Sequence, residues 1–538
     1  MTSWTFADVW EAIAAAQPDR PAHIQGERVV TWRQFDARAD ALAAHLVAAG
    51  LGHQAKVAAY LYNGPEYLET YVACFKAGLA PLNVNYRYGP DEVTYLLDNA
   101  DAEAVVFHSS LSGIVEQIRP RLPGVKRWYV VSDGGPEPDW AVPYEPVATR
   151  KVGRAKAPWG RSGDDLLLLY TGGTTGMPKG VMWRQDDLFN VLGAGGNITA
   201  GQPPAADLDD LAGRITQPGM RMLPACPLMH GTGQFSALIA MGLGGSVVTL
   251  NNRSLDPEVI WSTVEELKVN SVVIVGDAFA RPLLAALDAN PGRWDLSSLL
   301  LMSSSGVMWS QEVKEGLLKH HPGMVLFDSF GSSEAVGMGA STSTAGAPAA
   351  TASFQLGPRV KVFTDDGRPV EPGSDEAGFV AIGGFLPVGY YKDPEKTART
   401  FRTIDGVRYS VPGDYATVNA DGTLHLLGRG SVCINTGGEK VFPEEVEEVL
   451  KLHPTVRDAA CVGLPDERFG EVICALVEPI EGSQVDDAAL IEHVRGALAR
   501  YKAPRRVVAL PSLGRSPSGK LDYAALKSLA MERASSQP

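Results

Sequence analysis

The sequence predicts an α/β protein with a large N-terminal domain of several subdomains, one of them small and β-rich, followed by a smaller α+β C-terminal domain. Three observations support this prediction. Apolar segments of strand length alternate with helical patterns through most of the chain, which indicates α/β layers with mostly parallel sheets. The pattern becomes richer in strands from about residue 360. At 538 residues, the chain is also too long for a single compact core.

The N-terminal part of the chain is predicted to alternate helices with short strands. Apolar residues recur at helical spacing over residues 32–50, and Thr31 precedes this helix as its cap. Further helices are predicted at residues 4–16, 65–78 and 89–99. The predicted strands are short apolar runs at residues 29–32, 57–62, 80–85, 104–107 and 128–131.

A loop rich in glycine and threonine, residues 170–180, follows the apolar run 166–169, which is predicted to be a buried strand. Glycines let the backbone approach a ligand closely, and successive N–H groups form a concavity that attracts anions. The threonine hydroxyls and the charge of Lys179 add to this attraction. The loop is therefore predicted to hold a polyphosphate. The alternative is an ordinary glycine-rich turn, which needs fewer of these residues.

The alternation of strands and helices resumes after this loop. Strands are predicted at residues 246–250, 271–275, 299–303 and 324–328, with a helix at 256–268. Residues 340–353 are rich in small residues, which is typical of a flexible surface loop or a mobile wall. The β-rich part contains the predicted strands 360–363, 378–382 and 424–427. The C-terminal unit has predicted helices at 443–452 and 487–498 and strands at 459–462, 472–477 and 507–510.

Composition excludes several classes of function. The net charge of -14 argues against a nucleic-acid partner. The five cysteines form no C-x-x-C pair, which fits a reducing compartment and excludes a thiolate zinc site. The N-terminal residues lack the basic region of a signal peptide, and no apolar run reaches the length of a transmembrane segment. A cytoplasmic location is expected. The oligomeric state is left open, with a homodimer among the alternatives.

Residues 514–520 fit the glycine and lysine spacing of a Walker A loop. Leu521, however, stands where that motif needs a hydroxyl, and Pro517 removes one N–H from the cradle. This spacing is interpreted as a coincidence.

Several stretches in order resemble the motifs of the adenylate-forming superfamily, which contains acyl-CoA synthetases, peptide-synthetase adenylation domains and luciferases. The matching stretches are residues 170–180, 227–231, 328–334, 389–391, 413–414, 428–429, 437–447 and 516–520. The resemblance implies an adenylation domain over residues 1–428, a hinge at 429–431 and a mobile C-terminal domain over 432–538. It also implies that a carboxylate is converted by ATP to an acyl-adenylate and is then transferred to coenzyme A.

The resemblance implies Lys520, Glu334 and His230 as catalytic residues. Lys520 would hold the α-phosphate and the incoming carboxylate, because positive charge is needed where two anions meet. Glu334 would hold Mg²⁺, with Thr174 at the family's partner position. His230 belongs to the segment that gates the acid pocket.

The resemblance also implies binding roles for a larger set of residues. Thr171, Gly172, Gly173, Thr174, Thr175, Gly176 and Lys179 would contact the phosphates. Ser305, Gly306, Asp328, Ser329 and Phe330 would line the adenine slot, with Gly331, Ser332 and Ser333 in the same motif. Asp414 would accept hydrogen bonds from the ribose hydroxyls, Arg429 would reach the ribose or phosphate, and Gly437, Gly438, Glu439 and Lys440 would form the pantetheine channel.

The sequence departs from the family's pattern at four places, and one of these is Pro412, which stands where a threonine often precedes the Gly-Asp pair. Gly172 replaces a serine or threonine of the phosphate loop, and Ser333 replaces a threonine but keeps the hydroxyl. Gly430 and Ser431 stand where an acidic residue or lysine is usual, so the identity of the hinge residue is open.

The acid is predicted to be a hydrophobic monocarboxylate. The candidate pocket residues are small or apolar, namely Met229, His230, Gly231, Gln234, Gly276, Ser303, Gly337 and Met338. The chain most resembles bacterial ligases for long-chain fatty acids and steroid side-chain acids. An aryl acid is the alternative substrate. An acyl-AMP ligase or adenylating oxygenase that uses no CoA and a non-catalytic nucleotide-binding module are the alternative functions.

Overall fold

The computed structural model describes residues 3–173, 176–196, 201–436, 439–466, 469–516 and 519–535. These residues fold into two compact units. The first unit is built from the described parts of Met1–Gly173, Met177–Ala349 and Gly383–Ser410, and the second chiefly from those of Ala350–Ile382 and Val411–Pro538. The predicted residues Thr174, Thr175, Gly437 and Gly438 lie outside the described residues, as do the side chain of Lys440 and the surroundings of Gly172, Gly173 and Gly176.

The first sheet of the first unit is largely parallel and has the strand order β19-β9-β8-β4-β3-β5-β6-β7. Its strands are mostly continuous apolar runs, as expected where helices cover both faces of a parallel sheet. The bounds are β3 Lys56–Tyr60, β4 Ala80–Asn83, β5 Ala102–His108, β6 Arg127–Val131, β7 Val142–Pro143, β8 Leu166–Gly173, β9 Gly176–Arg184 and β19 Gly389–Tyr390.

Helices next to this sheet share one core with it. Every residue of α3, Pro65–Ala77, is buried. Aromatic side chains of α1, α2 and α3, among them Trp10, Phe35 and Phe75, pack in one cluster with strand residues such as Val57 and Leu167. The other helices here are α1 Phe6–Ala16, α2 Trp32–Ala48, α4 Pro90–Asn99, α5 Ser112–Ile118 and α6 Tyr144–Ala148. The predicted cap of α2 is confirmed, since Thr31 and Gln34 form a capping box.

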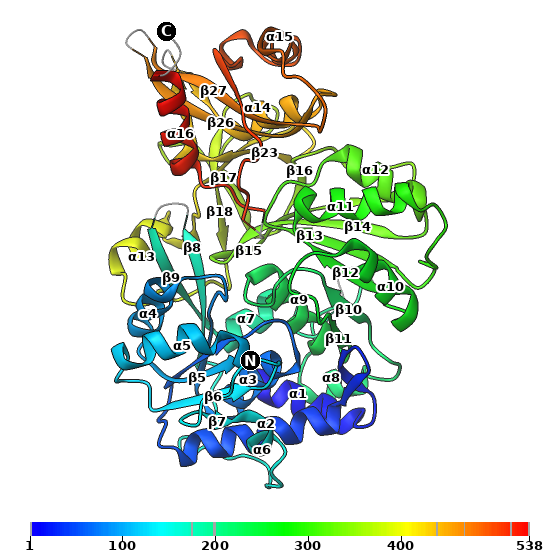
Figure 1. The fold of residues 1–538 in the computed structure, drawn as a ribbon, viewed down its shortest axis with the longest axis vertical. Coiled ribbons are helices and arrows are strands. Elements are labelled where there is room, and N and C mark those ends of the chain that lie inside the picture. The colour runs from blue at the N-terminus through cyan, green and yellow to red at the C-terminus, as the bar shows by residue number, and fades with distance from the viewer. Residues whose placement is uncertain are drawn as a thin grey trace. The chain divides into compact units, whose positions relative to one another are not determined.

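The second sheet of the first unit runs in the order β2-β1-β11-β10-β12-β13-β14-β15. Its central strands are parallel, and β2 and β15 pair with it antiparallel. Helices α10, α11 and α12 lie along one side of this sheet (Figure 1) and bury apolar side chains against it. The strands are β1 Pro21–Gln25, β2 Arg28–Thr31, β10 Arg221–Pro224, β11 Ser246–Thr249, β12 Ser271–Ile274, β13 Leu301–Ser305, β14 Val325–Ser332 and β15 Ala335–Ser343. The helices are α7 Gln185–Val191, α8 Leu208–Gly213, α9 Gly231–Gly242, α10 Pro257–Leu267, α11 Gly276–Ala289 and α12 Gln311–His320, and α13 Pro394–Thr400, β20 Phe401–Ile404 and β21 Val407–Ser410 complete the unit.

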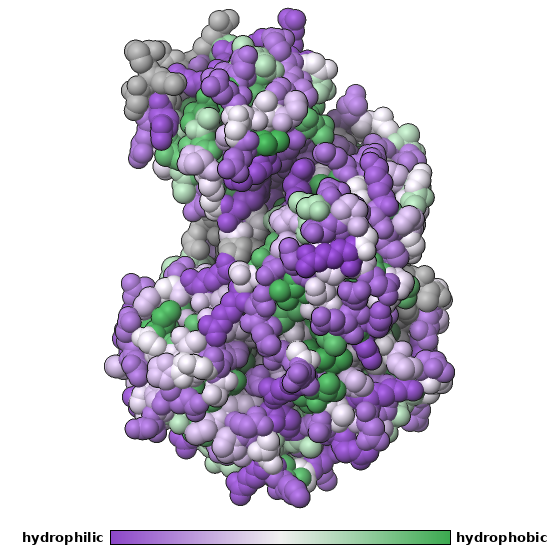
Figure 2. Space-filling model, turned by 45° about the vertical axis from the view of Figure 1, so that its right-hand side comes forward, coloured by the Kyte–Doolittle hydropathy of each residue, from purple (hydrophilic) through white to green (hydrophobic). Residues whose placement is uncertain are grey.

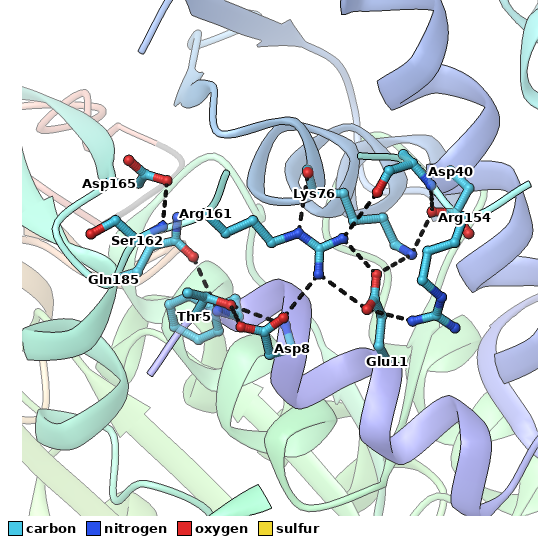
Figure 3. A network of polar contacts seen from close by, with 12 residues as sticks. Thr5, Asp8, Glu11, Asp40, Lys76, Arg154, Arg161, Ser162, Asp165 and Gln185 are labelled. Atoms are coloured by element: carbon cyan, nitrogen blue, oxygen red, sulfur yellow. Dashed lines mark hydrogen bonds and ion pairs between the residues drawn. The ribbon is translucent and has the colours of Figure 1, made fainter. Parts of the chain in front are cut away.

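A buried ionic network joins α1, α2 and α3 (Figure 3). The Lys76 Nζ atom lies 2.8 Å from Glu11 Oε1, 2.6 Å from Asp36 Oδ1 and 2.8 Å from Asp40 Oδ1, and its side chain is 0% exposed. Burial by itself would raise the pKa of Glu11, but hydrogen bonds and charge from Arg161 and Lys76 lower it to about 2. The carboxylate of Glu11 therefore stays ionised and holds α1 to its neighbours.

The second unit contains an antiparallel sheet and an α+β part. In the sheet, β16 pairs β23, β23 pairs β22, β22 pairs β18, and β18 pairs β17. In the α+β part, β26 and β27 form a long antiparallel pair, and β28 joins β27 in parallel. The strands are β16 Ser353–Leu356, β17 Val360–Phe363, β18 Gly378–Gly383, β22 Asp414–Val418, β23 Thr423–Arg429, β24 Ile434–Thr436, β25 Glu439–Val441, β26 Val456–Asp466, β27 Gly470–Pro479 and β28 Arg506–Ala509. The helices are α14 Pro443–Lys451, α15 Asp487–Ala497 and α16 Tyr523–Ser535.

The predicted fold class is confirmed, with differences in where strands end. The glycine-rich stretch 170–180 was predicted to be a loop, but β8 continues through Gly173 and β9 begins at Gly176. The two strands are hydrogen-bonded neighbours in the sheet, and this tertiary pairing overrides the low strand propensity of glycine. Likewise β14 continues to Ser332, and β15 covers the first residues of the predicted loop 340–353. The predicted hinge at 429–431 stays a prediction.

On the face drawn in Figure 2, hydrophilic residues predominate and hydrophobic residues lie in several separate groups. Scattered exposed apolar residues are normal for a folded domain. Among the described residues, no helix combines the length and the apolar character needed to cross a membrane.

Candidate functional site

Asn83, at the end of β4, connects the strand that enters the glycine-rich stretch with the segment 227–231. Its Nδ2 donates to the backbone oxygens of Tyr170, at 2.8 Å, and Met229, at 2.6 Å. Its Oδ1 accepts from the backbone N–H of Tyr170 at 2.7 Å. Asn83 is only 2% exposed. A buried amide with several partners fixes its neighbours strongly, because any rotation would leave polar groups unpaired.

The segment 227–231 packs against two other predicted motifs of the first unit. A Cβ atom at Gly231 would lie 3.4 Å from Leu169 Cδ2 and 3.5 Å from Ser333 Oγ. The hydroxyl of Thr232, in the first turn of α9, lies 3.5 Å from the backbone oxygen of Ser305. The start of α9, the middle of β8, the end of β13 and residue 333 are therefore close together. His230 stands at the N-terminus of α9 and is partly buried.

The residues predicted for the adenine slot lie on neighbouring strands. Ser305 of β13 is opposite Ser329 of β14, and Ser304 is opposite Asp328. Asp328 is buried and accepts a 3.1 Å hydrogen bond from Lys314 Nζ. Burial raises the pKa of Asp328 to about 6, although the lysine charge opposes this effect. Parallel strands place their carboxyl ends at one edge, where ligands of α/β sheets commonly bind.

Glu334 lies in the turn between β14 and β15, and two aromatic side chains hold this turn. The hydroxyl of Tyr390 donates to Glu334 Oε1 at 2.7 Å. The indole Nε1 of Trp183 donates to the backbone oxygen of Ser333 at 3.0 Å. The described residues contain no group of three or more His, Cys, Asp or Glu that could hold a metal ion by themselves. A single carboxylate fits Mg²⁺, which commonly binds one or two carboxylates together with substrate phosphates and water.

Lys179, in β9, forms an ion pair with Asp393 at 3.0 Å. The hydrogen bond from Lys179 to Asp393 raises the pKa of the lysine, so it carries its charge at neutral pH. The backbone of Thr171 belongs to β8, and its side chain is partly buried.

In the second unit, Asp414 and Arg429 face each other across β22 and β23. They are register partners, and Arg429 Nε lies 3.5 Å from Asp414 Oδ1. The Asp414 side chain is largely buried, and that of Arg429 is partly exposed. The structure thus brings these two predicted residues together at the start of the predicted hinge.

A buried carboxyl group from α14 contacts the same backbone. Glu444 Oε1 accepts a 3.5 Å hydrogen bond from the N–H of Arg429, and Oε2 has no hydrogen-bond partner among the described residues. Burial, with repulsion from Glu447, raises the pKa of Glu444 to about 8. Gly428 has a φ of +124°, and a Cβ atom there would overlap the Glu444 carboxyl group. Glycine is needed at this position, because it accepts a positive φ and has no Cβ atom to overlap the carboxyl group.

Lys520 is exposed and belongs to the second unit. The Lys520 N–H donates to Ser516 Oγ at 3.0 Å, and its C=O accepts from the Ser516 N–H at 2.8 Å. Glu439, in β25, is also exposed. Lys520, Glu439, Asp414 and Arg429 belong to the second unit, and Glu334, Asp328, His230 and Lys179 to the first.

Four residues that hold the site together have no role predicted from the sequence, namely Asn83, Lys314, Tyr390 and Glu444. Tyr390 and Glu444 lie within stretches that match the family's motifs, but neither has a predicted role. Asn83 is a polar residue in an otherwise apolar strand, and this pattern could have identified it as a buried residue with polar partners. The partners of Lys314 and Glu444 depend on side chains of other elements, and no local pattern reveals them.

Comparison with known proteins adds to this geometry. A family model for AMP-binding enzymes matches residues 10–391, and a model for the C-terminal domain of AMP-binding enzymes matches residues 445–520. The chain is 42% identical to the medium-chain acyl-CoA ligase Mig of Mycobacterium avium, covering 97% of each. It is 41% identical to a 3-oxocholest-4-en-26-oate–CoA ligase of Rhodococcus rhodochrous, covering 96% of this chain and 94% of that relative.

A solved structure also shares the fold. The anthranilate CoA ligase AuaEII, in complex with anthranoyl-AMP, superposes with a TM-score of 0.84 at 21% identity, covering 99% of this chain and 98% of that one. The ordered motifs, the two family models and the full-length relatives agree. The chain belongs to the AMP-binding enzyme family, within the adenylate-forming superfamily that its motifs resemble.

Proposed function

We propose that this protein is an ATP-dependent acyl-CoA ligase for a hydrophobic carboxylic acid of the fatty-acid or steroid side-chain type. The observation that carries the proposal is the 42% and 41% identity, over nearly the whole chain, to relatives named for these activities. The substrates would be the acid, ATP and CoA, and the products acyl-CoA, AMP and pyrophosphate.

In the first half-reaction, a carboxylate oxygen attacks the α-phosphorus of ATP, and the bond to pyrophosphate breaks. Lys520 would offset the negative charge that develops as the two anions meet. Thr171, Lys179 and the backbone of the glycine-rich stretch would hold the phosphates, and Asp414 would accept hydrogen bonds from the ribose hydroxyls. Glu334 would hold a magnesium ion, which when bound supplies positive charge to orient the phosphates.

In the second half-reaction, the thiol of CoA loses its proton and attacks the acyl carbonyl, and AMP leaves with the electrons of the broken C–O bond. We propose that residues 432–538 rotate about the hinge 429–431 between the two steps, so that Lys520 leaves and the stretch 437–440 takes part in the thiol channel. Such a hinge motion lets one active site serve two reactions.

The predicted acid pocket has an apolar character in keeping with this substrate class. Met229, Gln234 and Met338 are buried, and Gln234 donates to the hydroxyl of Tyr67 at 3.0 Å. Apolar lining with few polar groups suits a lipid acid. We also propose a cytoplasmic location, in keeping with five free cysteines.

The proposal is tested by carboxylate-dependent release of pyrophosphate from ATP, with and without CoA, across fatty, steroid side-chain and aryl acids. AMP and acyl-CoA formed together from a fatty or steroid acid are the expected result. Pyrophosphate release that is indifferent to CoA would identify an acyl-AMP ligase instead. Turnover restricted to aryl acids would replace the proposed substrate class with an aryl-acid CoA ligase.

A further inference from the structure

We infer that Tyr390 is a positioning residue that orients the Glu334 carboxylate toward the magnesium-bound phosphates of the nucleotide. The inference rests on the proposed function, because it needs Glu334 to face a metal–nucleotide complex. Tyr390 is the second residue of β19, and the sequence alone predicts no role for it.

The contact between the two residues is short and sheltered. The Tyr390 hydroxyl lies 2.7 Å from Glu334 Oε1, and Tyr390 is only 4% exposed. A hydroxyl that donates to an ionised carboxylate forms one of the stronger hydrogen bonds in proteins. One phenolic proton engages only Oε1, so the bond restricts rotation of the carboxylate and does not itself use Oε2. This is the arrangement expected of a residue that orients a metal ligand.

Tyr390 is itself held rigidly. Its backbone pairs with Val181 of β9, and its N–H donates to Thr397 Oγ1 at 2.9 Å. The preceding Gly389 has a φ of +155°, and a Cβ atom there would lie 2.5 Å from Thr397 Cγ2. The Lys396 ammonium lies 4.1 Å from the centre of the Tyr390 ring. A glycine is therefore needed at 389 to bring the tyrosine into this position.

Two side chains from β9 and β19 contact the turn between β14 and β15, and Tyr390 is one of them. Trp183, in the neighbouring strand β9, donates to the backbone oxygen of Ser333, next to Glu334. The strand β9 begins at Gly176, directly after the glycine- and threonine-rich residues predicted to hold the phosphates. The hydroxyl of Tyr390 thus couples the position of the carboxylate to the strand that leaves the phosphate-binding stretch.

The neighbouring Tyr391 provides a matched control. Its hydroxyl donates at 2.7 Å to the exposed Asp101 and not to Glu334. Changing either tyrosine to phenylalanine removes one hydroxyl that donates to one carboxylate at the same distance. Only Tyr390→Phe removes the contact with Glu334.

The test measures ATP binding to the full-length protein by isothermal titration calorimetry over a series of Mg²⁺ concentrations and without Mg²⁺. Tyr390→Phe is expected to raise the Mg²⁺ concentration needed for half-maximal enhancement of ATP binding by about 10-fold or more, as for other residues that orient a metal ligand. Binding of ATP without Mg²⁺ should be unchanged, and Tyr391→Phe should match the wild type in both conditions.

A double-mutant cycle with Glu334→Gln separates a positioning role from a general loss of structure. Tyr390→Phe should add little to the Mg²⁺ shift once Glu334 is changed, because the two residues act through one contact. A wild-type Mg²⁺ response in Tyr390→Phe, or an equal loss of ATP binding with and without Mg²⁺, would overturn the role of Tyr390 alone. A wild-type protein whose ATP binding does not respond to Mg²⁺ would overturn this inference, whereas failure of the proposed function would be seen as the absence of acyl-CoA formation in the pyrophosphate-release assay.

Discussion

The side chain of Asn83 pairs with both backbone polar groups of Tyr170, with its Oδ1 accepting at 2.7 Å and its Nδ2 donating at 2.8 Å. The same Nδ2 reaches Met229. One buried amide thus sets the positions of the strand before the phosphate-binding stretch and of the segment beside the predicted acid pocket.

Asn83→Asp should destabilise the protein and impair adenylation. The carboxylate can still accept from the Tyr170 N–H, but it cannot donate to the two backbone oxygens and it faces them with negative charge. Leaving two buried carbonyls unpaired is expected to lower the free energy of unfolding by about 2–4 kcal/mol. Urea unfolding measures this change. The control Asn85→Asp keeps its acceptor role toward the Arg87 N–H and loses only the side-chain hydrogen bond to Tyr88, at a position that is not fully buried, so it should cost much less than Asn83→Asp. Equal stability of both variants would contradict the role of Asn83.

Lys76→Met should destabilise the first unit strongly. The substitution removes the buried ammonium group that Glu11, Asp36 and Asp40 share. Breaking a buried ion pair in this way costs about 3–5 kcal/mol. Lys126→Met, which removes an exposed pair with Glu103, should cost about 1 kcal/mol or less. Chemical denaturation of both variants provides the comparison, and a small effect at Lys76 would show that the network adds little stability.

Glu444→Gln should stabilise the protein at alkaline pH. The pKa of Glu444 is raised from 4.5 to about 8, so the folded protein binds more protons than the unfolded chain between these values. The stability that Glu444 contributes is therefore present below about pH 4.5 and is lost as the pH rises through about 8. The glutamine variant cannot ionise, so its free energy of unfolding should exceed that of the wild type by an amount that grows from pH 6 to about pH 8, by about 1.4 kcal/mol per pH unit at most, and then levels off.

The control for this experiment is Glu448→Gln, on the same helix, where the carboxylate pairs with Lys451. It should keep the pH profile of the wild type. If Glu444→Gln leaves the dependence of stability on pH unchanged, another buried group, such as Glu447, causes the loss of stability at alkaline pH.

Lys520→Ala should abolish adenylation and spare the transfer step. Without this ammonium group, the charge that develops between the carboxylate and the α-phosphate has no counter-charge from position 520. Pyrophosphate release should fall by about 100-fold or more, as for loss of other transition-state contacts. Thioester formation from pre-made acyl-adenylate and CoA should continue near the wild-type rate. Lys527→Ala, which removes a surface pair with Glu471, is the control. Normal adenylation by Lys520→Ala would exclude the proposed role.

Much of the architecture could be predicted from the sequence, because the residues within each helix or strand carry the signal for it. Continuous apolar runs such as 166–169 and 472–477 are strands because parallel or buried strands need no polar face. The helix after Thr31 begins where its capping residues stand. The predicted ends of the strands were less accurate than the prediction that the strands exist. Residues 170–173 and 329–332 join strands because neighbouring strands pair with them. The local sequence does not show which strands will pair.

By itself, the sequence determined the fold class, the order of the motifs and the family, because glycine, threonine and charged residues at fixed spacings carry that information locally. Only the tertiary structure decided which side chains orient the predicted site. Asn83 is 87 residues from Tyr170 and Tyr390 is 56 residues from Glu334, yet each pair forms a hydrogen bond. Such contacts depend on how sheets and turns bring distant elements within about 3 Å, and a buried polar group must find its partner there or lose its hydrogen bond.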